Sequence, residues 1–117
     1  MGAFLAEARA LLAELVAIPS VSAEGRGLRE GAEKVAGVLE DLGLTPELHE
    51  GYGPPVVYAE GGEGERTLLF YNHYDVQPPD PLELWDTDPF VLAEREGAWW
   101  GRVPTTTRGS WWPGWWP

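Results

Sequence analysis

An apolar run that ends in a histidine–aspartate pair constrains the fold of this 117-residue chain more than any other feature. Residues 68–78 read LLFYNHYDVQP, and the first part of this run shows no alternation of polar and apolar side chains. Such a run is typical of a strand that is buried on both faces, as in a parallel sheet between helices. We therefore expect a buried strand with the polar pair at its C-terminal end, where open α/β sheets place ligand sites.

The pair itself consists of His73 and Asp75. Residues two apart in an extended chain project from the same face, so the carboxylate can reach one ring nitrogen of the imidazole. The other ring nitrogen then keeps its lone pair, which is how a metal-bound histidine is held. On spacing alone, a solvated loop pair is the commoner interpretation. The apolar run before the pair and the Val-Gln-Pro-Pro stop after it favour a metal ligand.

Composition excludes several classes of partner. The formal net charge of −11 opposes binding to nucleic acid or to an anionic membrane, because the field of the protein repels phosphate. No stretch approaches the roughly 18 apolar residues that cross a bilayer, and the N-terminus lacks the pattern of a secretory leader. The chain has no cysteine, which fits a reducing compartment. We expect a soluble, cytoplasmic protein.

Two helices are expected in the N-terminal part. Residues 4–18 carry one apolar stripe that indicates a core-packing helix, and Pro19 ends it. Residues 28–42 repeat the pattern, and Gly43 is well placed to terminate the second helix. Gly31 and Gly37 weaken this helix locally, which suggests close packing on a neighbour.

Short strands bounded by proline and glycine are expected at residues 45–50, 54–60, 90–95 and 98–102. His49 lies on the polar face of the first of these strands and is interpreted as a solvated histidine rather than a ligand. A hairpin turn at residues 61–65 should lead into the strand that begins at Thr67. Trp85 should anchor the acidic loop of residues 80–89, and Glu96-Gly97 should form the turn of the last hairpin.

Three segments together resemble a known family. They are YNHYDVQP at residues 71–78, PLELW at residues 81–85 and DPF at residues 88–90. The combination is similar to the dipeptidase branch of the co-catalytic zinc metallopeptidases, a family that includes carnosinase-type dipeptidases, glutamate carboxypeptidases, acetylornithine deacetylase and succinyl-diaminopimelate desuccinylase. The resemblance implies an α/β fold, here a partial three-layer sandwich in which two N-terminal helices pack on a mixed, partly parallel sheet.

The resemblance also implies roles for two residues. His73 matches a zinc ligand of the family, and Asp75 matches the residue that orients it. The family's next motif, Asp-Asp-Lys-Gly after Gly-Arg-Gly and a small residue, is missing, and no acidic residue follows Glu96. We therefore expect a truncated relative of an enzyme that hydrolyses peptide or amide bonds, inactive on its own and binding zinc weakly or not at all. Peptide substrates belong to the full-length form.

This division gives two regions. Residues 1–102 are expected to be the N-terminal portion of a zinc peptidase catalytic domain, and residues 103–117 are a Trp-rich tail without family resemblance. One hypothesis is that the tail is read in a shifted frame. A back-translation of the tail with one guanine restored after the Arg102 codon gives Gly-Ala-Asp-Asp-Asp-Lys-Gly followed by a helical sequence. This accounts for three successive threonines and two Trp-Trp pairs.

Two other interpretations of the chain stay open. It could be a non-catalytic module that binds itself or a partner, or a subunit that a separate chain completes with the missing ligands. A partial domain leaves apolar surface and a sheet edge uncovered, so we expect self-association into a dimer or a higher oligomer through these features.

Overall fold

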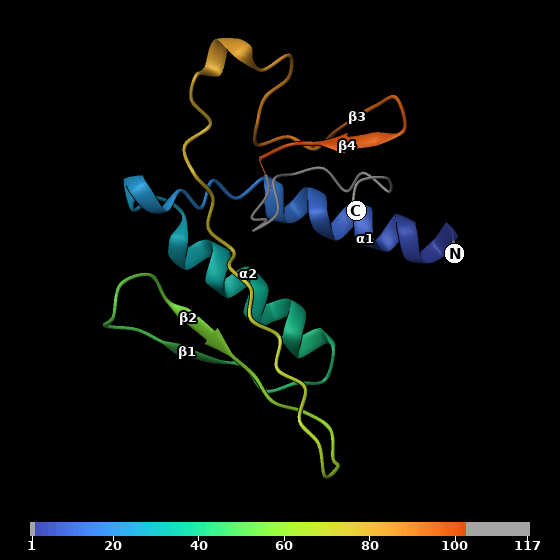
Figure 1. Ribbon diagram of the computed structural model, residues 1–117, viewed down its shortest axis with the longest axis vertical. Helices are drawn as coiled ribbons and strands as arrows, with labels where there is room; N and C mark the ends of the chain where they lie inside the picture. Colours follow the sequence, from blue (N-terminus) through green and yellow to red (C-terminus); the bar gives the residue numbers. More distant parts are fainter. Residues whose placement is uncertain (1, 103–117) are drawn as a thin grey trace, which may run out of the picture.

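Two helices form the N-terminal part of the protein, and both are predicted by the sequence. The computed structural model describes residues 2–102 (Figure 1). Helix α1 spans Gly2–Val16 and stops before Pro19, while α2 spans Leu28–Asp41. Gly43 follows α2 in the left-handed conformation (φ 83°), and its N–H donates to the Glu40 carbonyl at 2.8 Å. The glycine therefore terminates the helix as expected. A short 3-10 helix, η1 (Ser22–Glu24), lies between the two.

A first antiparallel hairpin lies against α2. Strand β1 (Glu47–His49) pairs with β2 (Val56–Tyr58), and Leu48 faces Val57 in the register. Both strands contact α2. His49 is exposed on the polar face, where its Nε2 lies 3.1 Å from a carboxylate oxygen of Glu47. The interpretation of His49 as a solvated strand histidine fits this position.

A second antiparallel hairpin lies beside α1 (Figure 1). Strand β3 (Ala93–Arg95) pairs with β4 (Ala98–Trp100). Glu96 (φ 53°) and Gly97 (φ 75°) both have positive φ, which defines the two-residue turn that matches strand twist. The loop before the hairpin contains the 3-10 helix η2 (Leu82–Leu84), and Trp85 anchors it by donating to the Pro79 carbonyl at 2.8 Å.

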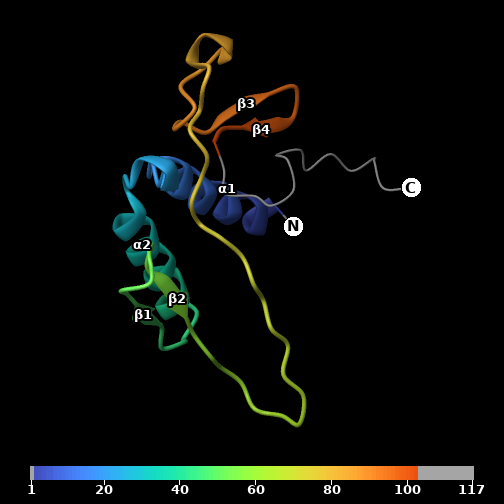
Figure 2. The same ribbon diagram turned by 60° about the vertical axis from the view of Figure 1, so that its left-hand side comes forward.

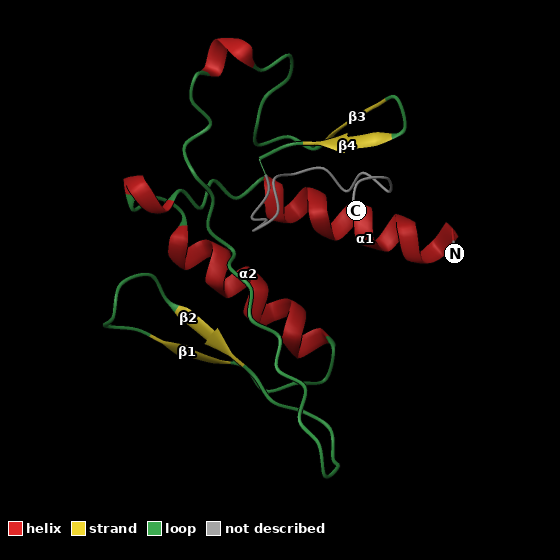
Figure 3. Cartoon of the chain, viewed as in Figure 1, coloured by secondary structure: helices red, strands yellow, loops and turns green. Residues whose placement is uncertain are grey.

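The strand expected at residues 68–74 is absent, and this prediction was wrong. Residues 59–75 form an extended arm without regular structure, coloured as loop in Figure 3. The arm crosses α2 in Figure 1, and the turned view of Figure 2 shows that its lower part lies away from the helices. The side chains of residues 68–71 are between 77% and 90% exposed. A strand needs partners, and the described residues supply none here, so the predicted hairpin turn at residues 61–65 has no second strand to join.

The core of the described residues is small. Its buried apolar side chains are Val16, Val21, Ala32, Ala36 and Val76. The predicted packing stripe of α1 is only partly covered: Val16 is buried and the middle of the stripe is half-buried, whereas Phe4 is 67% exposed. The Cα radius of gyration is 15.7 Å, whereas about 13 Å is typical of a compact domain of about 100 residues. The fold is therefore open.

The α/β class is confirmed, since two helices combine with two small antiparallel sheets. Parallel pairing among the described residues is limited to the single bridge between Val21 and Val76. This bridge is what remains of the expected mixed sheet, because a wider sheet needs strands that residues 2–102 do not contain. Neither α1 nor α2 has the length and apolar character of a membrane span. The tail hypothesis concerns residues 103–117, which lie outside the described part.

Candidate metal centre

The segment that carries the histidine–aspartate pair is held by the connector between α1 and η1. The Val76 N–H donates to the Ser20 carbonyl at 2.8 Å, and the Ser22 N–H donates to the Val76 carbonyl at 3.3 Å. The buried hydroxyl of Ser20 donates to the Tyr74 carbonyl at 2.9 Å. Together these bonds keep residues 74–76 extended, which is the conformation that places residues 73 and 75 on the same side.

Tyr74, between the two members of the pair, points the other way and packs on α2. A Cβ built on Gly31 would lie 2.9 Å from Cδ2 of the Tyr74 ring, so only glycine leaves room for the ring here. The Tyr74 hydroxyl donates to the Pro55 carbonyl at 2.6 Å. Burial raises the pKa of the Tyr74 phenol above its ordinary value, and the nearby Asp75 carboxylate raises this pKa further. Tyr74 therefore fixes the segment to the helix and to the first hairpin.

His73 and Asp75 form the hydrogen-bonded pair that their spacing predicts. Nδ1 of His73 lies 3.1 Å from Oδ1 of Asp75 and 2.9 Å from the carbonyl oxygen of the same residue. A carbonyl oxygen only accepts hydrogen bonds, so Nδ1 must carry the hydrogen. In the neutral ring, Nε2 then has the lone pair. Within residues 2–102, Nε2 makes no hydrogen bond or ion pair, so it is available to a metal ion.

His73 and Asp75 lie at the surface, and within the described residues no third potential metal ligand joins them. The side chains of His73 and Asp75 are 36% and 32% exposed. The described residues contain no group of three or more histidine, cysteine, aspartate or glutamate side chains that could hold a metal ion. His49 belongs to the β1–β2 hairpin and does not join the pair. The arrangement can therefore present one nitrogen ligand, oriented by one carboxylate.

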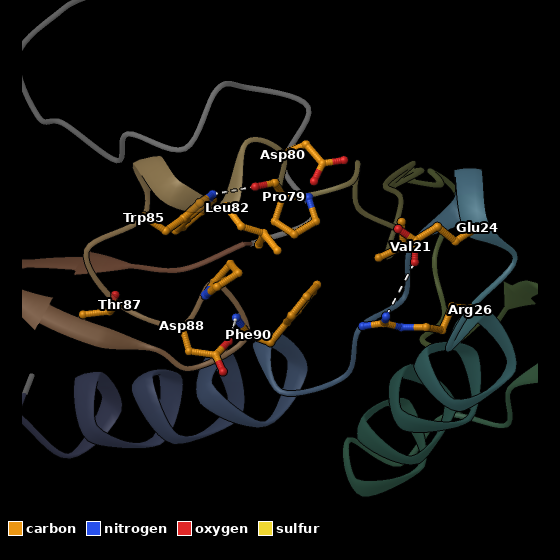
Figure 4. A pocket seen from close by; sticks show the side chains of 11 residues that line it. Val21, Glu24, Arg26, Pro79, Asp80, Leu82, Trp85, Thr87, Asp88 and Phe90 are labelled. Atoms are coloured by element: carbon orange, nitrogen blue, oxygen red, sulfur yellow. Dashed lines mark hydrogen bonds and ion pairs between the residues drawn. The ribbon is translucent and has the colours of Figure 1, made fainter.

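A cleft of about 510 Å³ lies beside this region but contains neither member of the pair. It opens between residues 21–26 and the loop of residues 79–90, with the aromatic side chains of Trp85 and Phe90 on its walls (Figure 4). Three of its charged side chains are already engaged within the cleft. Arg26 lies 3.6 Å from the Glu24 carboxylate, and Asp88 accepts a hydrogen bond from the Phe90 N–H at 2.8 Å. We assign the cleft no chemistry.

The structure brings His73 and Asp75 together, as their spacing predicts. It also shows the contacts that hold their segment in place, which the sequence did not predict. The connector at residues 18–22 is the missed element, because its pairing with residues 74–76 joins positions that are far apart in the chain. One sequence feature pointed to the contact. Gly31 suggested close packing on α2, and the neighbour is the ring of Tyr74. Gly37 has no such neighbour, since nothing lies within 4 Å of a Cβ built there.

Comparison with known proteins gives relatives of greater length. No protein-family model matches the chain. A succinyl-diaminopimelate desuccinylase from Xylella fastidiosa (strain 9a5c) is 38% identical over 101 residues, which cover 86% of this chain and 26% of the relative. Another, from Janthinobacterium sp. (strain Marseille), is 39% identical over 93 residues, or 80% of this chain and 24% of the relative. The chain spans about a quarter of the length of these curated relatives.

One solved structure is similar in both sequence and fold. An M20 family metallo-carboxypeptidase from Sulfolobus solfataricus superimposes with a TM-score of 0.73 at 40% sequence identity. The match covers 78% of this chain and 21% of that chain.

Proposed function

From the relationship of this chain to the M20 metallopeptidase family, over a part of that family's length, we propose that it supplies one metal ligand of a centre that hydrolyses peptide or amide bonds. In this proposal His73 binds zinc through Nε2, and Asp75 orients the ring. The observation that carries the proposal is the double contact of His73 Nδ1 with two acceptors of Asp75, at 3.1 and 2.9 Å. It favours the tautomer that ligation through Nε2 requires.

The described residues do not fit a complete zinc site. Zinc in proteins takes three or four protein ligands, whereas residues 2–102 offer no group of three candidate side chains. The remaining ligands must therefore come from outside these residues. A single imidazole should bind zinc weakly, so we propose that residues 2–102 do not catalyse hydrolysis by themselves.

What these residues do in the proposed centre is to hold one ligand in place. The Ser20 hydroxyl and the bridge between Val21 and Val76 keep the backbone of the pair extended. Tyr74 fixes the same segment to α2 through its contact with Gly31. A ligand whose backbone is tied at three points needs little reorganisation when the rest of a metal centre forms around it.

A zinc titration followed by NMR of the histidine rings tests this proposal. We expect zinc to bind weakly and to shift the ring signals of His73. His49→Ala should leave this response unchanged, and in His73→Ala zinc should not shift the ring signals of the remaining histidine, His49. Asp75→Asn keeps the backbone acceptor of Nδ1 but removes the charge, so it should weaken binding without abolishing it. A response that survives His73→Ala would show that the ligand assignment is wrong.

A second candidate function is a non-catalytic module that binds another polypeptide. The observation in its favour is the exposed apolar run at residues 68–71. The occupant could be a chain that completes the domain or a second copy of this chain. Adding a candidate completing chain should give tight zinc binding in the first case only.

A further inference from the structure

Six carbonyl groups in a row, at residues 74–79, each accept a hydrogen bond. The first three accept from the connector between α1 and η1 and from Nδ1 of His73. The last three accept from the side chains of Arg102 and Trp85, and the bond from Trp85 to the Pro79 carbonyl is drawn in Figure 4. The connector therefore holds the backbone through the histidine–aspartate pair, and the two later side chains hold it directly after the pair.

The second half of this row needs donors from side chains. Pro78 and Pro79 have no N–H group, so this stretch offers a neighbouring strand little more than carbonyl oxygens. Nε of Arg102 donates to the Gln77 carbonyl at 2.7 Å, and Nη2 of Arg102 donates to the Pro78 carbonyl at 3.2 Å. A planar, permanently charged fork suits two adjacent acceptors, and such charge-assisted bonds are about twice as strong as neutral ones.

Arg102 is itself held in place where the second hairpin ends. Its own N–H donates to the Pro89 carbonyl at 2.6 Å. The residue before it, Gly101, lies against the buried side chain of Val16. A Cβ built on Gly101 would lie 3.1 Å from Cγ1 of Val16, closer than the ~3.5–4.0 Å of ordinary carbon contacts. The glycine therefore lets the end of the hairpin approach α1, and Arg102 follows at a position from which its guanidinium reaches both carbonyls.

We propose that Arg102 is a positioning residue of the candidate metal centre, which fixes the backbone after Asp75 and thereby keeps Asp75 aligned with His73. This inference rests on the proposed function, because it gives Arg102 a part in the same site. The bonds of the guanidinium go to the backbone at residues 77 and 78 and not to the side chains of the pair. A carboxylate orients a metal ligand well only when its own backbone is held.

Zinc titration followed through the ring signals of His73 measures this role. Arg102→Ala should weaken zinc binding about three- to tenfold, which is less than the ~10–100-fold typical of a group that bonds directly to a metal ligand. Arg102→Lys should recover part of the loss, because an ammonium group can bind a carbonyl but lacks the fork that spans two. Arg95→Ala is the matched control and should bind zinc like the parent chain, since Arg95 belongs to the same hairpin but binds the Asp86 carboxylate.

Hydrogen exchange without zinc separates this role from a general loss of stability. The Val76 N–H lies in the held segment and donates to the Ser20 carbonyl, whereas the Ala36 N–H lies inside α2. Loss of a hydrogen bond to a charged group changes a local opening equilibrium roughly tenfold or more, so Arg102→Ala should accelerate exchange at Val76 by about that factor. Exchange at Ala36 should stay within about twofold of its rate in the parent chain, because the helix opens separately.

Different results would refute the metal centre and the role of Arg102. If zinc did not shift the ring signals of His73 in the parent chain, the proposed metal centre would be wrong, and this inference with it. If the parent chain responded and Arg102→Ala bound zinc equally well, the role of Arg102 would be wrong while the metal centre stood. Equal acceleration of exchange at Val76 and Ala36 would also overturn this role, because Arg102 would then contribute to overall stability alone.

Discussion

Two glycines of α2 should respond in opposite ways to the same substitution. Replacing a glycine inside a helix by alanine stabilises a protein by about 0.5–1 kcal/mol when the new methyl group meets nothing. Gly37 is such a position, since nothing lies within 4 Å of a Cβ built there. At Gly31 the same Cβ would lie 2.9 Å from Cδ2 of Tyr74 and 3.2 Å from Cβ of Ser20. Both distances are shorter than the ~3.5–4.0 Å of ordinary carbon contacts.

The Tyr74 ring cannot move aside at low cost. Its hydroxyl donates to the Pro55 carbonyl at 2.6 Å, and its own carbonyl accepts from the Ser20 hydroxyl at 2.9 Å. Overpacking of this kind costs about 1–3 kcal/mol. After subtraction of the helix gain, Gly31→Ala should be destabilising by roughly 0–2.5 kcal/mol, and the two variants should differ by about 1–3 kcal/mol.

Thermal unfolding followed by circular dichroism measures the difference. For a domain of about 100 residues, 1 kcal/mol corresponds to about 4–8 °C in Tm. Gly37→Ala should therefore raise Tm, and Gly31→Ala should unfold at least about 4 °C below it. If Gly31→Ala raised Tm as much as Gly37→Ala, the ring of Tyr74 would not be seated on α2. The account of how the histidine–aspartate pair is supported would then be wrong.

Three further outcomes are expected. Ser20→Ala should destabilise the protein by about 1–3 kcal/mol, because it leaves the carbonyl of Tyr74 without its donor, and urea unfolding measures this; an unchanged midpoint would contradict it. Glu96→Asn should raise Tm, because asparagine tolerates the φ of 53° and precedes Gly97 as the two-residue turn prefers; a lower Tm would count against the turn assignment. The frameshift hypothesis predicts that one guanine restored after the Arg102 codon brings the downstream gene sequence into the family's reading frame, and a correct, in-frame stretch with other codons would remove it.

The parts of the fold that the sequence predicts are those that local interactions determine. The helix at residues 28–41 follows from apolar periodicity and from Gly43 at its end. The last hairpin follows from Glu96-Gly97 between two short apolar runs. The contact between His73 and Asp75 is also local, because a spacing of two residues in an extended chain suffices to bring the two side chains together.

The parts that the sequence could not predict depend on distant partners. The apolar run at residues 68–71 has the composition of a buried strand, but composition does not supply the neighbours that burial requires. In the same way, nothing near Tyr74 in the sequence indicates that its hydroxyl reaches Pro55 or that Ser20 binds its carbonyl. Gly31 is the one residue whose sequence signal indicates these contacts. It weakens the helix, and its close packing against Tyr74 explains why a glycine lies there.

The central claim is that His73 is one ligand of a metal centre that residues outside 2–102 complete. The most direct test mixes this chain with a polypeptide that covers the remaining part of the Xylella fastidiosa relative, and then measures the zinc that is retained after dialysis. The account predicts stoichiometric zinc in the mixture, none in the chain alone, and a loss of zinc when the mixture contains His73→Ala. Stoichiometric zinc in the chain alone, or undiminished zinc with His73→Ala, would contradict it.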